Sequence, residues 1–238
     1  LRIKNLTFAM LIEQTKDRQA TAILCSAGLD SAVLLAAEAR SRFVQPVYVA
    51  AGLAWESDEL LALNQLLETQ AFLTNVGRPV RLEATVHDVY PPSHWAIKGQ
   101  APAYDTPDAD VYLVGRNAIL LSKVAVFCCQ HGIGRIAIGS LANNPFPDGT
   151  PEFLEAMANA LSLGLAHDLS IVAPLTKHHK ADVIALGIEL KVPLELTLSC
   201  MQPENGLHCG LCSKCRERRD AFNEAGVPDL TDYKMPSP

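Results

Sequence analysis

The chain has 238 residues, of which 49% are hydrophobic and 19% are charged, and its 20 basic and 26 acidic residues give a net charge of −6. That apolar fraction supports a folded core and excludes disordered and collagen-like classes. The acidic balance does not favour a nucleic-acid partner, because phosphate backbones attract basic surfaces. No apolar run reaches the roughly 20 residues of a membrane helix, and the run at 8–12 is too short for a signal peptide. We therefore expect a cytoplasmic protein without a membrane span.

Short apolar runs alternate with longer segments of helical composition from residue 20 onward. Strands are expected at 21–25, 46–50, 80–85, 135–139 and 169–172, and helices at 31–42, 57–75, 116–130, 150–167 and 178–190. The second strand is placed so that Pro46 is its first residue, where the missing N–H is tolerated. This alternation is typical of a doubly wound parallel α/β sheet, which binds ligands at the carboxyl ends of its strands.

Three parts of the chain are distinguished by composition. We expect an N-terminal extension at 1–19, an α/β domain at 20–195, and a cysteine-containing segment with a C-terminal helix at 196–238. Within the α/β domain, residues 87–110 are rich in proline and aspartate and read as a long loop. Loops of this length are more often functional lids than idle connections.

The connection between the first strand and the first helix has the composition of a phosphate-binding loop. Gly28 permits a tight turn and a close approach of a ligand, and the amides at the start of the next helix favour an anion. Ser26 and Ser31 add hydroxyl donors, and Asp30 is suited to capping the helix or holding Mg²⁺ between phosphates. The Gly-Lys-Ser/Thr ending of the P-loop is missing. We predict a pyrophosphate loop, with a capped turn that binds no ligand as the alternative.

Four of the seven cysteines crowd into the last fifth of the chain. They follow the spacing C-x8-C-x2-C-x2-C, at Cys200, Cys209, Cys212 and Cys215. Four thiolates complete a tetrahedral zinc site and leave no position for water, so we expect a structural Zn²⁺. An iron–sulfur cluster is the main rival, because ferredoxins also use two-residue spacings.

The loop at 26–31 resembles the Ser-Gly-Gly-x-Asp-Ser signature of the PP-loop ATP pyrophosphatases, with Ala27 at the second glycine. With the cysteine cluster, the chain resembles the 7-cyano-7-deazaguanine synthase family of queuosine biosynthesis. Further matching segments are Val-Gly-Arg-Asn at 114–117, Ile-Gly at 138–139, Pro-Leu at 174–175, Lys-Ala-Asp-Val-Ile at 180–184, and 192–200 leading into the first cysteine. The similarity extends over about 20–225.

The resemblance implies a fold, a reaction and a set of site residues. The implied fold is a PP-loop sheet of the adenine nucleotide alpha hydrolase-like type. The implied reaction converts 7-carboxy-7-deazaguanine, a 7-deazapurine carboxylate, and ammonia to 7-cyano-7-deazaguanine through an adenylated intermediate, with ATP, Mg²⁺ and Zn²⁺ as cofactors. The ATP-binding residues carried over are Cys25, Ser26, Ala27, Gly28, Leu29, Asp30, Ser31 and Gly139. Asp30, Arg116 and Lys180 are the catalytic candidates, since cations stabilise charge on transferring phosphate oxygens.

Two stretches depart from the family pattern. Residues 51–55 read Ala-Gly-Leu-Ala-Trp where the family has Tyr-x-Gln-Arg-His, and the loop at 143–150 lacks the family's Cys and Arg. Asn143, Asn144 and Asp148 are expected to bind the edge of a purine-like substrate through paired donors and acceptors. The same residues also fit a polar turn ahead of a capped helix.

Several alternatives stay open at the level of sequence. One is a PP-loop ligase that adenylates another carboxylate or amide, and another is a non-catalytic nucleotide- or zinc-binding relative. The products could be AMP and pyrophosphate or ADP and phosphate. The sequence leaves the ammonia source and the oligomeric state open, with a homodimer as one option.

Overall fold

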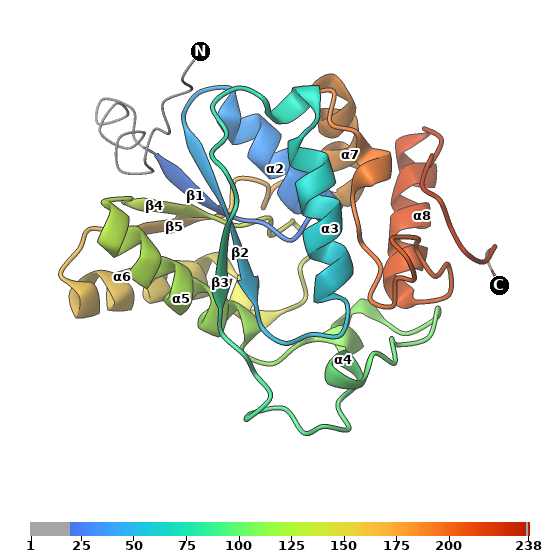
Figure 1. Ribbon diagram of the computed structural model, residues 1–238, viewed down its shortest axis with the longest axis horizontal. Coiled ribbons are helices and arrows are strands. Elements are labelled where there is room, and N and C mark those ends of the chain that lie inside the picture. Colours follow the sequence, from blue (N-terminus) through green and yellow to red (C-terminus); the bar gives the residue numbers. More distant parts are fainter. Residues whose placement is uncertain (1–19, 237) are drawn as a thin grey trace, which may run out of the picture.

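The computed structural model describes residues 20–236 and residue 238, so the expected N-terminal extension lies outside the described residues. Five parallel strands form one sheet in the order β3-β2-β1-β4-β5 (Figure 1). They are β1 (Thr21–Leu24), β2 (Val44–Ala50), β3 (Val80–Glu83), β4 (Arg135–Ala137) and β5 (Ser170–Val172). The chain runs outward from β1 to β3 and then returns to the other side of β1. This confirms the predicted doubly wound parallel α/β sheet, with its switch point between β1 and β4.

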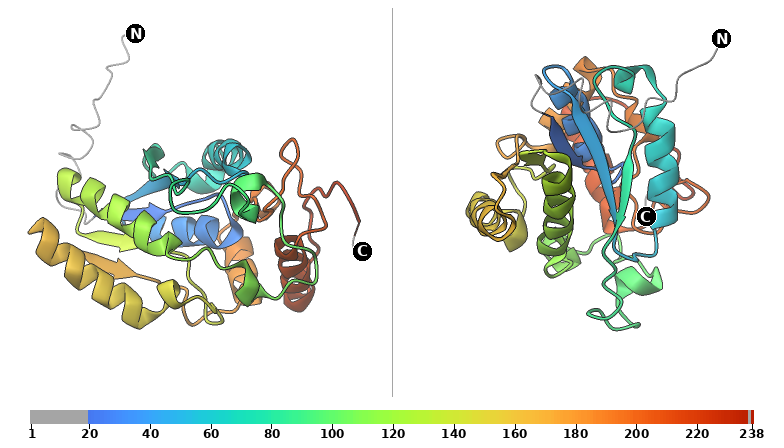
Figure 2. Two further views of the ribbon diagram at one scale, coloured as in Figure 1. Left: turned by 90° about the horizontal axis from the view of Figure 1, so that it is seen from below. Right: turned by 60° about the vertical axis from the view of Figure 1, so that its left-hand side comes forward.

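Helices cover both faces of the sheet (Figure 2). The helices are α2 (Leu29–Ala39), α3 (Glu56–Leu67), α4 (Trp95–Lys98), α5 (Arg116–His131), α6 (Pro151–Leu165), α7 (Lys180–Glu189) and α8 (Ser213–Ala225). Alternate residues of a strand point to opposite faces. Accordingly, Ala22 packs with α5 and α6 in one core cluster, and its neighbour Ile23 packs with α2, α3 and α7 in the other.

Several elements depart from their expected bounds: α2 spans Leu29–Ala39 where a helix at 31–42 was expected, β4 ends at Ala137 where the strand was expected to reach 139, and β2 and α3 differ as well. β2 begins at Val44, so Pro46 is the third residue of the strand and not its first. The side-chain amide of Gln45 donates to the carbonyls of Pro46 at 3.1 Å and Arg78 at 2.6 Å, which supplies bonds beside the imino residue. The helix expected at 57–75 ends at Leu67 and is followed by a separate 3-10 turn at Gln70–Phe72.

The segment at 87–110 is less irregular than expected. It contains α4 and the start of a 3-10 turn at Asp108–Val111. Shorter 3-10 turns also lie at Pro147–Gly149 and Leu194–Leu196. In the part of the chain that the structure describes, no helix is both long and apolar enough to cross a membrane.

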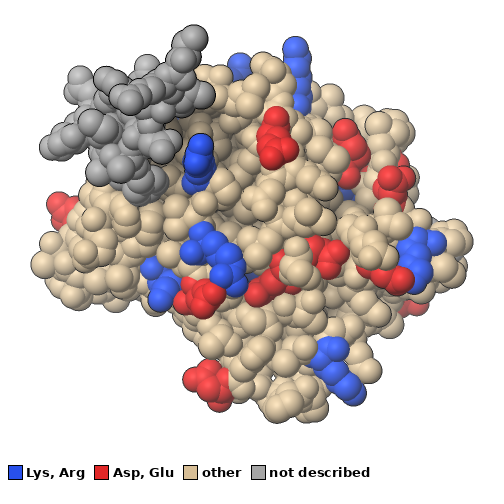
Figure 3. All heavy atoms as spheres, in the orientation of Figure 1, with Lys and Arg blue, Asp and Glu red and all other residues tan. Residues whose placement is uncertain are grey.

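The C-terminal segment packs onto the sheet core. Cys200, Cys212 and Cys215 belong to the same buried cluster as α5 and α6. The fully buried Arg218 of α8 donates to the carbonyl of Leu194 at 2.7 Å and to other groups near it, which ties α8 to the segment after α7. On the face shown in Figure 3, basic and acidic side chains of the described residues are interspersed, and no wide basic area forms.

Candidate active site

A cavity of about 640 Å³ opens at the carboxyl ends of β1 and β4. This is the switch point of the sheet, where doubly wound folds bind ligands. Of the predicted nucleotide-contacting residues, all but the buried Ala27 line the cavity, and so do the predicted catalytic and substrate-binding residues. Cys200 also lines it, so the cysteine cluster borders the same space.

The loop between β1 and α2 turns at Ala27. Ala27 has a φ of 58°, in the left-handed region, whereas Gly28 has a φ of −64° and precedes the first residue of α2. The expectation that Gly28 makes the tight turn is therefore wrong, because the positive φ falls on the residue that departs from the signature. For alanine this conformation costs about 1 kcal/mol or more. The carbonyl of Ala27 accepts a hydrogen bond from the amide of Leu198 at 2.9 Å, which stabilises the turn from outside the loop.

Hydrogen bonds within the loop leave the start of α2 open. The hydroxyl of Ser31 donates to the carbonyl of Gly28 at 2.9 Å and accepts from the amide of Ser26 at 3.4 Å. No side chain caps the N-terminus of α2. The first amides of a helix have no partner within it, and the helix dipole places positive potential there. The geometry therefore suits an anion such as a phosphate.

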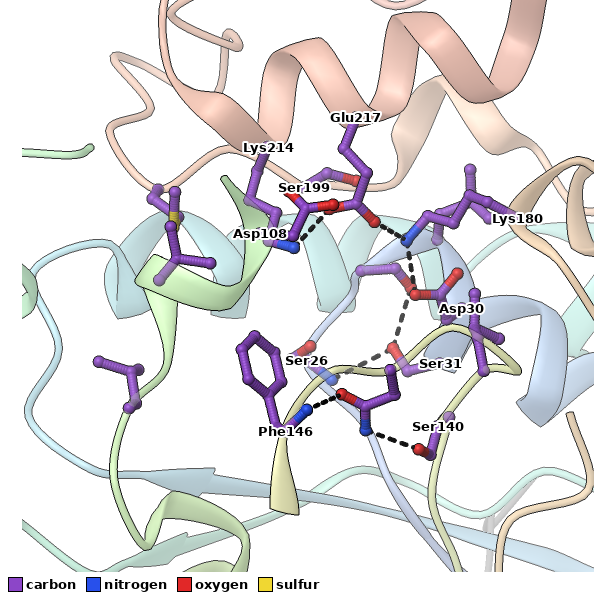
Figure 4. A pocket seen from close by; sticks show the side chains of 18 of the residues that line it. Ser26, Asp30, Ser31, Asp108, Ser140, Phe146, Lys180, Ser199, Lys214 and Glu217 are labelled. Carbon is purple, nitrogen blue, oxygen red and sulfur yellow. Dashed lines mark hydrogen bonds and ion pairs between the residues drawn. The ribbon is translucent and has the colours of Figure 1, made fainter. Parts of the chain in front are cut away.

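A chain of alternating charges crosses the cavity beside this loop (Figure 4). The ammonium of Lys180 lies 2.7 Å from a carboxylate oxygen of Asp30 and 3.0 Å from one of Glu217, which also pairs with Lys214. Burial disfavours the charged form of Lys180, but the two carboxylates outweigh it and raise the pKa of Lys180 above its ordinary value. Burial likewise disfavours ionised Glu217, yet the two lysines lower its pKa to about 2. Lys180 and Glu217 therefore hold each other in the charged form at neutral pH.

The second carboxylate oxygen of Asp30 is buried and has no hydrogen-bond partner among the described residues. A buried acceptor without a partner is costly, and carboxylate oxygens are the ligands that Mg²⁺ prefers. Gly139, two residues after the end of β4, packs closely against Asp30. A Cβ on Gly139 would lie 3.3 Å from the Cβ of Asp30 and 3.4 Å from the amide nitrogen of Ser31. Any larger residue at 139 would crowd the start of α2.

Arg116 occupies another part of the cavity wall. It is the first residue of α5 and follows Gly115, which has a left-handed φ of 74°. Its buried Nε has no hydrogen-bond partner among the described residues. Nearby, the buried Glu59 of α3 accepts a hydrogen bond from the hydroxyl of Tyr48 at 2.8 Å. Burial raises the pKa of Glu59 to about 7, although the positive charge of Arg116 opposes the shift.

The residues predicted to bind substrate differ in how free they are. The carboxylate of Asp148 accepts from the amide of Asn117 at 2.9 Å, so it satisfies the start of α5. The side chain of Asn144 donates to the hydroxyl of Ser140 at 2.8 Å. Asn143 is exposed at the cavity rim, where its side-chain amide nitrogen lies 3.1 Å from Nδ1 of His179. Asp148 and Asn144 thus make the local hydrogen bonds of a polar turn, and both also line the cavity.

Two aromatic pairs line the cavity. The rings of Trp55 and Trp95 stack with centroids 5.8 Å apart, and those of Tyr112 and Phe146 with centroids 5.2 Å apart. Trp55 comes from the stretch at 51–55 that departs from the family pattern. Flat apolar rings of this kind suit the faces of a heterocyclic ligand.

Tyr48, Glu59 and Glu217 are among the polar residues of this cavity that sequence reasoning missed. Glu59 and Tyr48 meet only because α3 packs over β2, and Glu217 meets Lys180 only because α8 packs beside α7. The one available signal for Glu59 was its place in the first turn of the helix that follows β2. For Glu217 no motif gives a signal, since a glutamate on a polar helix ordinarily faces solvent.

The four predicted cysteines come together. Their sulfur atoms all lie within 4.8 Å of one another, with Cys212 and Cys215 3.5 Å apart and Cys200 and Cys212 3.9 Å apart. Tetrahedral zinc with Zn–S bonds of about 2.3 Å requires sulfurs about 3.8 Å apart. The amides of Gln202 and Cys209 both donate to the sulfur of Cys200 at 3.3 Å, which favours a thiolate there. The donor set and its geometry are compatible with Zn²⁺.

Comparison with known proteins identifies the family. The family described as queuosine biosynthesis protein QueC matches residues 20–226. The chain belongs to the QueC family. The 7-cyano-7-deazaguanine synthase of Methanothrix thermoacetophila is 34% identical over 221 residues, which cover 89% of this chain and 97% of that protein. The enzyme of the same name from Thermoplasma volcanium is 41% identical over 128 residues, covering 51% of this chain and 53% of that protein.

Among solved structures, similarity is more distant. A predicted subunit of a tRNA methyltransferase from Methanocaldococcus jannaschii aligns over 91% of this chain and 93% of that chain, at 12% identity and a TM-score of 0.44. Membership of the QueC family rests on the sequence matches, which confirm the resemblance found from the motifs.

Proposed function

We propose that this QueC-family chain converts 7-carboxy-7-deazaguanine and ammonia to 7-cyano-7-deazaguanine at the expense of ATP. Its relatives carry the name of that activity. The observation that carries the proposal is the juxtaposition, in one cavity, of the uncapped start of α2 with the Asp30–Lys180 ion pair. This arrangement supplies amide donors for phosphates, an oxygen ligand for Mg²⁺ and a partly buried cation.

Each group has a role in activating a carboxylate with ATP. The loop at 25–31 holds the phosphates, and the unpartnered oxygen of Asp30 accepts Mg²⁺. Lys180 and Arg116 stabilise the negative charge that develops when the substrate carboxylate attacks the α-phosphorus and pyrophosphate leaves. Ammonia then displaces AMP and loses a proton, which gives the amide. A second ATP activates the amide oxygen, and loss of AMP with two protons gives the nitrile. The nucleotide products are accordingly AMP and pyrophosphate.

The heterocycle is assigned to the aromatic part of the cavity. The stacked pair of Trp55 and Trp95 offers apolar faces, and Asn143 at the rim offers both a donor and an acceptor. Arg116 could serve both the substrate and the nucleotide, since its guanidinium can neutralise either a carboxylate or a phosphate.

The metal is assigned a structural role. Cys200, Cys209, Cys212 and Cys215 would hold Zn²⁺ with all four positions filled by sulfur. A site of that kind stabilises the fold and leaves the reaction to the groups in the cavity.

The test is a single incubation with ATP, Mg²⁺, ammonium and 7-carboxy-7-deazaguanine, followed by mass spectrometry. AMP together with the nitrile is the expected result. AMP that forms without amide or nitrile would redirect the search to another acceptor, and the absence of AMP with intact ATP binding would contradict the adenylation chemistry. Protein without any ATP binding would indicate a non-catalytic relative.

A further inference from the structure

Glu217 connects the nucleotide loop to the metal-binding segment. Its carboxylate pairs with Lys214 one turn earlier in α8 and lies 3.0 Å from Lys180, which starts α7. Lys180 in turn lies 2.7 Å from Asp30 in the first turn of α2. The starts of three helices that are far apart in sequence therefore meet through one chain of charges (Figure 4).

The position of Glu217 is set by the cysteine cluster. Cys212 precedes the first residue of α8, and Cys215 lies in its first turn. The amides of Cys215 and Arg216 donate to the carbonyl of Cys212 at 3.0 and 3.2 Å, so this turn is closed directly at the cluster. A metal ion held by Cys212 and Cys215 would therefore fix the turn from which Glu217 reaches the cavity.

Lys180 needs a second anionic partner once Asp30 is engaged. Its side chain is only 19% exposed, so an unpaired ammonium there is costly. Mg²⁺ at the free oxygen of Asp30 would weaken the attraction of that carboxylate for Lys180. Glu217 is the other carboxylate that contacts the ammonium among the described residues, and it approaches from the side opposite to the loop.

We propose that Glu217 is a positioning residue that holds Lys180 at the nucleotide loop and thereby links ATP binding to retention of the metal. The inference rests on the proposed function, because it requires that ATP with Mg²⁺ binds at Asp30. Without Glu217, Asp30 is the one carboxylate left beside the Lys180 ammonium among the described residues, so Lys180 competes more strongly with Mg²⁺ for that carboxylate. By reciprocity, if the metal-ordered turn favours ATP, then ATP favours the metal-bound turn by the same factor.

The test compares the zinc-loaded wild type with Glu217→Gln, which keeps the shape of the side chain and removes its charge. Titration calorimetry with ATP and Mg²⁺ is expected to show binding weakened about 10-fold, while zinc content stays the same. The rate at which a chromogenic chelator removes zinc is the second readout. ATP is expected to slow this rate several-fold in the wild type and to leave it unchanged in the variant. Glu189→Gln is the matched control. Glu189 lies on α7, the same helix as Lys180, and the change breaks its exposed ion pair with Arg40, away from the cavity.

The outcomes separate the inference from the function on which it rests. Equal ATP affinity in wild type and Glu217→Gln, or undiminished protection of zinc by ATP in the variant, overturns the inference alone. Failure of the wild type to bind ATP overturns the proposed function as well. If Glu217→Gln does not fold, Glu217→Asp serves in its place, because it keeps the charge on a shorter side chain that cannot reach Lys180 in the same way. If ATP affinity and the protection of zinc by ATP are then identical to those of the wild type, the inference is overturned.

Discussion

The ammonium of Lys180 lies 2.7 Å from the carboxylate of Asp30, although 150 positions separate the two residues in sequence. The pair brings the start of α7 against the start of α2, at the carboxyl end of β1. The same carboxylate keeps one buried oxygen free of any partner among the described residues. Asp30 therefore offers one oxygen to a fixed cation and one to a ligand, which makes it the most informative residue to change.

Asp30→Ala is expected to lower AMP production at least about 100-fold, because it removes both the proposed Mg²⁺ ligand and the partner of Lys180. The fold should survive, since the Asp30 side chain lies at the cavity surface with 24% exposed. AMP release and the circular dichroism spectrum are the measurements. Asp88→Ala, at an exposed residue outside the cavity, is the control. Unchanged turnover would remove Asp30 from the mechanism.

Glu59 predicts a pH dependence of stability. Its pKa is raised by burial from 4.5 to about 7 in the folded protein. The folded state therefore holds this proton more tightly, so the stability that Glu59 contributes is complete below pH 4.5 and is lost as pH rises through about 7. Glu59→Gln does not titrate. Its stability relative to the wild type should improve by up to about 3 kcal/mol between pH 4.5 and 8, at 1.36 kcal/mol per pKa unit.

Thermal melts of both proteins across this pH range provide the measurement. Taking the difference between the two proteins cancels the titration of every other group that they share. Melting temperatures that stay parallel across the range would show that Glu59 has an ordinary pKa.

The left-handed φ of Ala27 predicts that glycine destabilises the protein much less than valine does at this position. Ala27→Gly relieves the positive φ but loses a buried methyl and gains unfolded-chain entropy, so stability should change by less than about 1 kcal/mol. Ala27→Val places a β-branched side chain at the same φ in a fully buried position, and should cost at least about 3 kcal/mol. Urea unfolding measures both, with Ala160→Val on the exposed face of α6 as the control. A well-tolerated valine at 27 would contradict the left-handed turn.

The cysteine cluster predicts about one zinc per chain by elemental analysis. If zinc saturates the site about 1,000-fold above its dissociation constant, it contributes about 4 kcal/mol. Chelation or Cys212→Ser should then lower the melting temperature on the order of 10 °C. Cys25→Ser changes a buried cysteine outside the cluster and serves as the control, because it should leave the zinc content unchanged. An iron–sulfur absorption band would contradict the zinc assignment.

The sequence was most informative where chemistry is encoded by spacing. The convergence of the four cysteines and the alternation of strands and helices were predictable, because each depends on residues close together in sequence. The reversal of strand order also followed from the doubly wound class. The left-handed φ of Ala27 was not predictable, since alanine gives no signal for it and the bond from Leu198 that supports it is tertiary.

The electrostatics of the cavity were beyond the reach of sequence. The shifted pKa of Glu59 depends on burial under α3, and the pairing of Glu217 depends on how α8 packs beside α7. At Pro46 the prediction from sequence was wrong. Proline is tolerated at the first residue of a strand, and this rule placed the start of β2 too late. The side chain of Gln45 supplies hydrogen bonds beside Pro46.

The hydrogen bond from Leu198 to Ala27 has a consequence for how the protein is made. Translation reaches the loop after β1 long before it reaches Leu198, whose amide supports the turn of that loop. Lys180 arrives almost as late. The nascent chain must therefore carry an incomplete loop until the segment that contains Lys180 and Leu198 has been made and has docked. Because such long-range closure slows folding, the proposed ATP site would be completed only late in folding, after this distant segment has packed against the loop.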